Sequence, residues 1–562
     1  VFIGIDSNAH DSDPAIREFA ESHGLGFPVL KDESNKVADQ ALAERTPEVL
    51  VLDGRAIVRY RGAIDDQYGQ GTSRPRATRT YLKDALEALT AGRPVALKAT
   101  ETPGCIIDRV DPKPSVSSSP RVRPAPPEVV TARRELEGKG QAAVGEVTYA
   151  GAAARIIQDR CQSCHRPGQV GPFPLVSYDD VRKHAAMIAE VVDNRRMPPW
   201  HADPRYGRFA NDRSLSARER ATLLAWVEQG APLGDPAQVP PARSFPEGWT
   251  IGKPDVVIDT PQSYTVPAQG VVEYVRLRVP AVFKEDRWIQ AAEARPGDRS
   301  VVHHIIGYVD DHRSKRGGPG SLAHLCGYAP GDMPSVYSPG TAKLIPAGAD
   351  LIFEIHYTPI GKVRTDRSSI GLIFAKEPVT REAFTVGIAE SGFLIPPHQD
   401  NVPVSSSLTF DQDVRLLSFM PHMHLRGKDF KYTIVRPGKA PEVILSVPAY
   451  DFGWQSYYTL AEPISLPRGT RIDCLAHYDN SDRNPSNPDP SRTVRWGDQT
   501  FEEMMIGYID LDLPRGARLN LGPLARSQSR SPARGVLQAA AALLGFPGAA
   551  KPAPGAIAAK PH

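Results

Sequence analysis

The sequence contains few cysteines, almost no net charge and no long apolar run. Its 562 residues include 5 cysteines, of which Cys105 is the first. The 67 basic and 65 acidic residues leave a formal net charge of +2, which argues against nucleic acid or an acidic membrane surface as a partner. No apolar run reaches the roughly 20 residues that span a bilayer, and the longest, residues 536–546, is interrupted by Gln538. We therefore expect no transmembrane segment.

Proline and glycine, by contrast, are abundant. The 54 prolines and 46 glycines exceed the average usage of roughly 5% and 7%, which predicts many turns and β connections and argues against an all-helical fold. The length predicts several domains. The chain starts at Val1 inside a strand-like segment, so we expect the natural N-terminus, with any signal peptide, to precede it.

Residues 1–110 alternate strand and helix signals. Asp13-Pro14 is typical of a helix start, with Asp13 as the cap, and residues 81–89 are expected to form a closing helix. The order of Thr46-Pro47, a strand, a hairpin at Asp53-Gly54 and a helix resembles the second half of a thioredoxin-like (redoxin) domain, in which that proline is cis. Because residues 1–104 lack cysteine, this N-terminally truncated unit is not expected to exchange disulfides.

A Pro- and Ser-rich linker is expected at residues 111–145. It precedes the motif Cys161-x-x-Cys164-His165, in which two thiols bind the haem vinyl groups and the histidine binds iron. The alternatives are a thioredoxin-type or a zinc Cys-x-x-Cys, although no second ligand pair for zinc lies nearby. The motif predicts one covalently bound haem c in residues 146–245.

The residues after this motif predict a small all-α haem domain. A helix is expected over 178–194, and Ser216 and Glu219 form a capping box at the start of another. The stretch resembles a c-type cytochrome. Met197 is the expected second axial ligand, since a thioether opposite histidine suits electron transfer, and His201 is the competing candidate.

From about residue 250 the pattern changes to short β-rich runs separated by proline and glycine, which predicts sandwiches. Neighbouring residues in a strand point to opposite faces, so two adjacent histidines bind one ion only across a twist or bulge. Imidazole together with thioether sulfur favours copper over zinc, calcium or magnesium. The candidate ligands are His303, His304, His356, His422, His424 and Met504.

In order, these motifs resemble the copper type II, ascorbate-dependent monooxygenases, the family of dopamine β-hydroxylase and peptidylglycine hydroxylating monooxygenase. The resemblance implies two all-β antiparallel, jelly-roll-like sandwich domains, at 250–381 and 382–513, with a solvent cleft between two copper ions. His303, His304 and His356 would hold the electron-storing copper. His422, His424 and Met504 would hold the copper that binds dioxygen and attacks a substrate C–H bond. Only Cys326 and Cys474 occur in these domains, so the disulfides of the animal enzymes are expected to be absent.

The resemblance implies a copper monooxygenase that uses O2, a small or peptide-like substrate, and electrons from the fused haem or from ascorbate. Haem attachment and copper indicate a periplasmic or secreted location. One alternative is an electron-transfer or copper-binding protein without hydroxylase activity, and another is a haem peroxidase or reductase with β domains as a scaffold. The tail at 514–562 is rich in Arg, Ala, Pro and Gly and is expected to be disordered.

Overall fold

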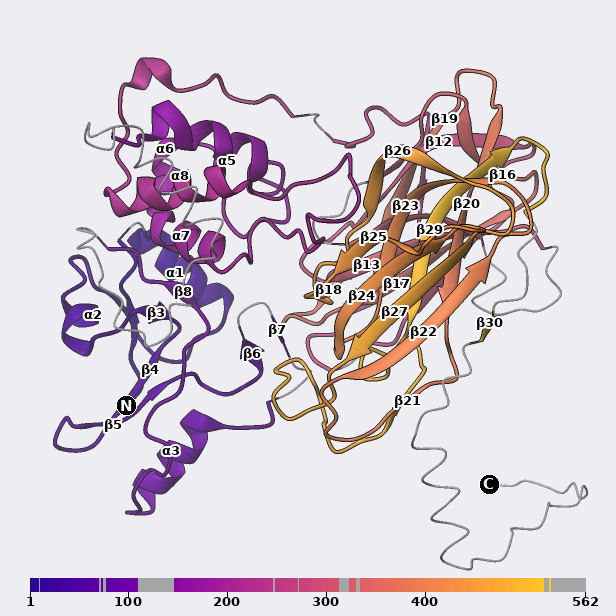
Figure 1. Ribbon diagram of the computed structural model, residues 1–562. Helices are drawn as coiled ribbons and strands as arrows, with labels where there is room; N and C mark the ends of the chain where they lie inside the picture. Colours follow the sequence, from indigo (N-terminus) through magenta and orange to yellow (C-terminus); the bar gives the residue numbers. More distant parts are fainter. Residues whose placement is uncertain are drawn as a thin grey trace, which may run out of the picture.

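The computed structural model describes residues 1–9, 11–69, 72–73, 77–109, 146–245, 248–270, 272–312, 323–329, 334–519 and 525–526. The predicted linker at 111–145 and most of the predicted tail lie outside them. Figure 1 shows a small α/β unit, a helical unit and a large β part along the chain. Among the described residues, no helix has the length and apolarity needed to cross a membrane.

The N-terminal unit builds separate two-stranded sheets. β1 and β2 are parallel, while β3-β8, β4-β5 and β6-β7 are antiparallel. Its elements are β1 (Gly4–Asp6), α1 (Asp13–Ser22), β2 (Val29–Lys31), α2 (Lys36–Ala41), β3 (Arg45–Thr46), β4 (Val49–Leu52), β5 (Val58–Gly62), β6 (Tyr68–Gly69), β7 (Thr72–Ser73), α3 (Tyr81–Thr90) and β8 (Cys105–Ile106).

Several local predictions for this unit are confirmed and one is wrong. The closing helix is α3, and Thr46-Pro47 is cis. The cap of α1 is Ser12 rather than Asp13, because the Ser12 side chain accepts a 3.4 Å hydrogen bond from the backbone N–H of Ala15. Because the strands form no single sheet, the thioredoxin-like character of this unit stays a prediction.

The helical unit packs short helices around buried apolar side chains that include Ile157, Val181, Leu223 and Trp226. Its elements are a π-helical turn (Tyr149–Ala153), α5 (Ala154–Arg160), α6 (Tyr178–Lys183), α7 (Ala185–Asp193), α8 (Ala217–Glu228) and a 3-10 turn (Pro236–Gln238). The predicted capping box at the start of α8 is confirmed.

The single helix expected over 178–194 is wrong, since the chain breaks it into α6 and α7 at His184. The His184 ring lies parallel to Phe173, with ring centroids 3.7 Å apart. Its Nδ1 lies 2.8 Å from the carbonyl oxygen of Asp180. These side-chain contacts accompany the break.

The β part consists of two sandwiches that share one sheet. The shared nine-stranded sheet has the order β26-β23-β29-β20-β16-β12-β19-β9, with β15 beside β12. A four-stranded sheet, β11-β17-β13-β14, completes the first sandwich, and a five-stranded sheet, β25-β24-β27-β22-β30, completes the second. Each sandwich has its own buried core.

The strands are β9 (Val256–Asp259), β10 (Tyr264–Val266), β11 (Val275–Val279), β12 (Arg287–Arg295), β13 (Val302–Asp310), β14 (Ala323–Tyr328), β15 (Ser335–Val336), β16 (Thr341–Ile345), β17 (Asp350–Tyr357), β18 (Arg364–Asp366), β19 (Ser369–Phe374), β20 (Arg381–Ala389), β21 (Leu394–Ile395), β22 (Val402–Thr409), β23 (Val414–His422), β24 (Gly427–Val435), β25 (Glu442–Val447), β26 (Tyr458–Leu466), β27 (Arg471–Tyr478), β28 (Val494–Arg495), β29 (Ile506–Pro514) and β30 (Ala525–Arg526). The expected runs of strands are thus present.

The two sandwiches join where β16 and β20 pair in parallel, with Thr341 opposite Arg381. Lys343 of β16 is buried at this junction, and its ammonium group donates hydrogen bonds of 2.8 Å to the His324 carbonyl and to the Thr385 hydroxyl. A buried ammonium group with several acceptors links strands of both sandwiches, which holds them in one orientation.

Replacing Asp512 by alanine is expected to destabilise the protein by about 3 kcal/mol. This carboxylate is fully buried and pairs with Arg381 and Arg415, which tie β20 and β23 to β29. Its loss leaves two partly buried guanidinium groups without their carboxylate partner. Chemical denaturation measures the effect. The matched control is Asp473→Ala, whose partner Arg471 is largely exposed, with an expected cost under about 1 kcal/mol; equal costs would contradict the prediction.

Candidate functional site

Three imidazoles converge between two neighbouring strands of the four-stranded sheet. His304 of β13 lies directly opposite His356 of β17, and a bulge separates Val302 from His304. The bulge breaks the alternation of the strand, so His303 turns to the same place. One ligand nitrogen from each of the three residues lies within 4.8 Å of the other two. The expected bulge is confirmed, and we call these residues the β13–β17 set.

The β13–β17 set offers neutral nitrogens. The Nδ1 atoms of His303 and His304 lie 3.1 Å apart, and the buried Nδ1 of His356 has no hydrogen-bond partner among the described residues. Burial lowers the pKa of His303 and of His356 to about 4. Burial, followed by the charges of nearby histidines, also lowers the pKa of His304. Neutral imidazoles with unused lone pairs fit one copper ion.

A second set of imidazoles lies at the end of β23. The rings of His422 and His424, the β23 set, are 5.3 Å apart and nearly perpendicular. The Nδ1 of His422 lies 2.6 Å from Gln455 Oε1, and the Nδ1 of His424 lies 3.3 Å from the carbonyl of Glu502. The Nε2 of His424 is buried without a partner among the described residues. Both residues therefore leave Nε2 for a metal ion.

The predicted sulfur ligand precedes strand β29. Ile506 of β29 pairs with His422, so Met504 is two residues before the position opposite that ligand. The carbonyl of Met504 accepts a 2.7 Å hydrogen bond from the hydroxyl of Tyr478, which fixes the backbone there. The next residue, Met505, is fully buried in the core. The thioether of Met504 as a copper ligand stays a prediction.

A buried carboxyl group supports the β23 set. Glu503 accepts hydrogen bonds from the backbone N–H groups of His424, at 2.8 Å, and Arg426, at 2.6 Å. Burial raises the pKa of Glu503 to about 8. Arg426 is itself buried and donates a 2.9 Å hydrogen bond to Asn480. These contacts hold the turn after His424 against the segment that carries Met504.

One aromatic ring contacts both sets. Phe452 stacks on His303 with ring centroids 5.4 Å apart, and its ring meets His424 edge-on at 5.9 Å. The resemblance implied a solvent cleft between the metals. In the structure the Phe452 ring lies against both sets, so the two candidate metal sites are neighbours across this side chain, and the solvent cleft stays a prediction.

Sequence reasoning missed Phe452, Gln455 and Tyr274. The Tyr274 ring stacks on His356 at 5.1 Å and lies 5.4 Å from His304. None of the three is a typical metal ligand, and each reaches the histidines from a distant part of the chain. The only feature of the sequence that could have pointed to one of these three residues is the polar Gln455 within a stretch rich in aromatic residues.

The predicted haem motif follows α5. The Nδ1 of His165 lies 3.1 Å from the carbonyl of Phe173, which leaves Nε2 for iron. Cys161 and Cys164 are free thiols. A Cβ at Gly171 would come within 2.9 Å of His165, so only glycine fits there. Burial raises the pKa of the Cys161 thiol to about 12. The two thiols and the free Nε2 of His165 are the groups that a covalent haem requires.

The candidates for the second axial ligand lie after α7. The backbone N–H of Met197 donates a 3.0 Å hydrogen bond to Val191, and its thioether as an iron ligand stays a prediction. His201 is partly buried near Asp451 of the second sandwich, and this partial burial lowers its pKa. Because His201 lies next to a residue of the β part, the case for His201 as the competing ligand of the haem iron is weaker.

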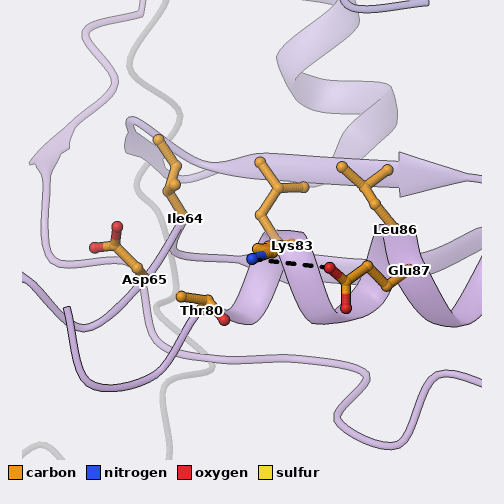
Figure 2. A pocket seen from close by; sticks show the side chains of 7 residues that line it. Ile64, Asp65, Thr80, Lys83, Leu86 and Glu87 are labelled. Atoms are coloured by element: carbon orange, nitrogen blue, oxygen red, sulfur yellow. Dashed lines mark ion pairs between the residues drawn. The ribbon is translucent and has the colours of Figure 1, made fainter.

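A surface hollow of about 280 Å³ lies on the N-terminal unit, along α3 (Figure 2). Its lining includes Ile64, Leu86 and the ion pair of Lys83 with Glu87. It contains no histidine, cysteine or methionine. We assign it no part in the chemistry of the histidine sets.

Comparison with known proteins shows that the second sandwich is similar to domains of copper-dependent oxidoreductases. Residues 383–511 match the family described as copper type II ascorbate-dependent monooxygenase, C-terminal domain. The matched region includes His422, His424 and Met504 but not the β13–β17 set. The match covers less than half of the chain, and it supports a copper-dependent monooxygenase at the level of the family.

Other likenesses are weaker. An uncharacterized conserved protein from Geobacillus kaustophilus shares 33% identity over 20% of this chain and 60% of its own, with a TM-score of 0.17. The structure of PNGF-II shares 7% identity over 44% of this chain and 60% of its own, with a TM-score of 0.20. The chain thus spans 60% of each of these proteins. No curated protein matches the chain.

Proposed function

We propose that this chain is a copper-dependent monooxygenase that hydroxylates a C–H bond of a small or peptide-like substrate with O2. The observation that carries the proposal is the pair of neutral, partly to fully buried histidine sets on either side of Phe452. The second set falls in the region that matches the monooxygenase family. Each set would hold one copper ion, with Met504 as the third ligand beside His422 and His424.

The protein's own residues prepare these sites. Gln455 and the carbonyl of Glu502 each engage the Nδ1 of one histidine, which directs both Nε2 atoms to the metal. Burial keeps the imidazoles neutral, so no proton competes with the ion. Copper, when bound, supplies the one-electron chemistry and the activation of O2.

We further propose that the helical unit holds a haem c through Cys161, Cys164 and His165. The haem would supply electrons at high effective concentration, because it sits on the same chain, and ascorbate is the alternative donor. The free thiols and the Nδ1 contact of His165 support this assignment. Haem attachment and copper together favour a periplasmic or secreted location.

Metal analysis with oxygen-uptake measurements tests the proposal. We expect two copper ions per chain, and oxygen consumption with a reductant and a suitable substrate. His422→Ala should abolish copper-dependent oxygen uptake. A haem peroxidase on a β scaffold would keep its peroxidase activity in that variant, and a copper-binding protein would load copper without consuming oxygen. Fewer than two bound copper ions would refute the proposal.

Replacing Met504 by leucine is expected to lower turnover roughly 10- to 100-fold, a loss comparable to that of a group that supports a metal ligand. Leucine keeps the volume but removes the sulfur donor. The matched control is Met505→Leu, a core residue with the same change of side chain, which should keep nearly full turnover. Steady-state oxygen uptake measures both; equal turnover in the two variants would contradict the role of the sulfur.

A further inference from the structure

Residues 200–212, here called the strap, leave the helical unit and attach to the second sandwich. Around Phe209 the strap runs antiparallel to β26, the edge strand of the nine-stranded sheet, in a bridge that pairs Phe209 with Leu460. The backbone N–H of Ala210 donates to Thr459 at 2.8 Å, and that of Ala461 donates to Arg208 at 2.9 Å. In Figure 1, β26 lies on the side of the sheets that faces the helices. The strap therefore covers an otherwise open sheet edge.

Asn211 makes the most specific contact of the strap. Its side-chain N–H donates to the carbonyl of Tyr457 at 2.8 Å, and its oxygen accepts from the backbone N–H of Thr459 at 3.1 Å. One amide group thus holds the backbone on both sides of Tyr458. Leaving those groups unpaired is costly.

Aromatic packing adds to this attachment. The rings of Trp200 and Phe209 lie 4.9 Å and 5.6 Å from the ring of Tyr458, and 6.0 Å from each other. Tyr458 is buried, at 2% exposure. Edge-to-face and tilted aromatic pairs at these distances stabilise a contact beyond the area they bury.

The strap holds the start of β26, which directly follows residues 450–457, here called the copper-site loop. This loop carries Phe452, which contacts both histidine sets, and Gln455, which engages His422. At its first residue, the hydroxyl of Tyr450 donates to the carbonyl of Met423 at 2.8 Å. The loop is therefore held at one end beside the β23 set and at the other end by the strap.

We infer that the strap maintains the geometry of the second copper site: Asn211 and Trp200 are positioning residues that keep Gln455 oriented toward His422. The inference rests on the proposed function, because it assigns copper to the β23 set. The strap begins three residues after Met197, so the haem unit and the copper site share one short, anchored segment. The helical unit then contributes to the geometry of the copper site as well as to electron supply.

A double-mutant cycle between Asn211 and Gln455 tests this. Copper(II) affinity and the copper(II) EPR spectrum are measured in a His304→Ala background, in which only the β23 set binds. Asn211→Ala and Gln455→Ala are each expected to weaken copper binding about tenfold, within the range for groups that orient a metal ligand. Because both changes release the same contact, the double variant should also lose about tenfold. A loss near a hundredfold would mean independent effects and would overturn the inference.

Two controls separate the possible failures. Arg205→Ala alters an exposed strap residue that pairs within the strap, with Asp203, and should leave affinity and spectrum unchanged. If Asn211→Ala does not fold, Trp200→Ala takes its place in the cycle, and Trp200→Phe is the conservative variant that should restore copper affinity. Unchanged copper affinity in Trp200→Ala would overturn the inference. If the background itself binds no copper, the proposed function fails. Binding in the background with unchanged affinity in every strap variant refutes only the inference.

Discussion

Replacing His424 by alanine is expected to remove one of the two bound copper ions and to abolish copper-dependent oxygen consumption. The buried Nε2 of His424 has no hydrogen-bond partner among the described residues, and burial first, then His422, lowers its pKa to about 3. The lone pair is therefore available to a metal at neutral pH. Turnover should fall by more than the roughly 100-fold that loss of a supporting group can cause.

The control for this change is another histidine of the same sandwich. His477 of β27 pairs with Asp429 at 2.8 Å and is no part of either histidine set. His477→Ala should keep two copper ions and full turnover. Atomic absorption and an oxygen electrode measure both variants. Two copper ions bound to His424→Ala would show that this imidazole is no ligand and would remove the basis of the second site.

The sequence allowed predictions of features that depend on a few adjacent residues. The capping box of Ser216 and Glu219 begins α8 because its two hydrogen bonds lie within four residues. The bulge beside His304 was expected because the strand alternation alone would direct His303 away from a shared ion. The six ligand candidates came from four short motifs and the family resemblance that these motifs carry, and the structure brings five of them into two sets.

Features that depend on distant residues could not be predicted. The parallel pairing of β16 with β20 joins the sandwiches through a contact that no turn signal specifies. The break at His184 accompanies a ring that packs against Phe173 from a separate segment. Phe452 and Gln455 gain their importance only because the fold places their loop between the two histidine sets. Local sequence patterns contain none of this information.

The double variant Cys161→Ser with Cys164→Ser is expected to lose all covalently bound haem while it keeps two copper ions. Serine keeps the shape of the cysteine side chain, but its hydroxyl forms no thioether with the haem vinyl groups. The wild-type chain, produced in cells that attach haem c, should carry one haem that survives denaturation, seen by mass and by its absorbance. The copper ligands lie in other domains, so copper content should not change. Each single variant should keep one thioether bond and a shifted spectrum.

Cys105→Ser is the control, since Cys105 is an exposed thiol of the N-terminal unit, and its haem content should equal that of the wild type. The two alternatives for the Cys-x-x-Cys motif give different results. A zinc site would show bound zinc that the double variant loses, without any haem absorbance in the wild type. A thioredoxin-type pair would form a disulfide with no cofactor. A chain that is free of haem before any substitution would therefore rule out the cytochrome assignment, yet it would leave the copper sites intact, because their ligands lie in the β part and not in the helical unit that carries Cys161 and Cys164.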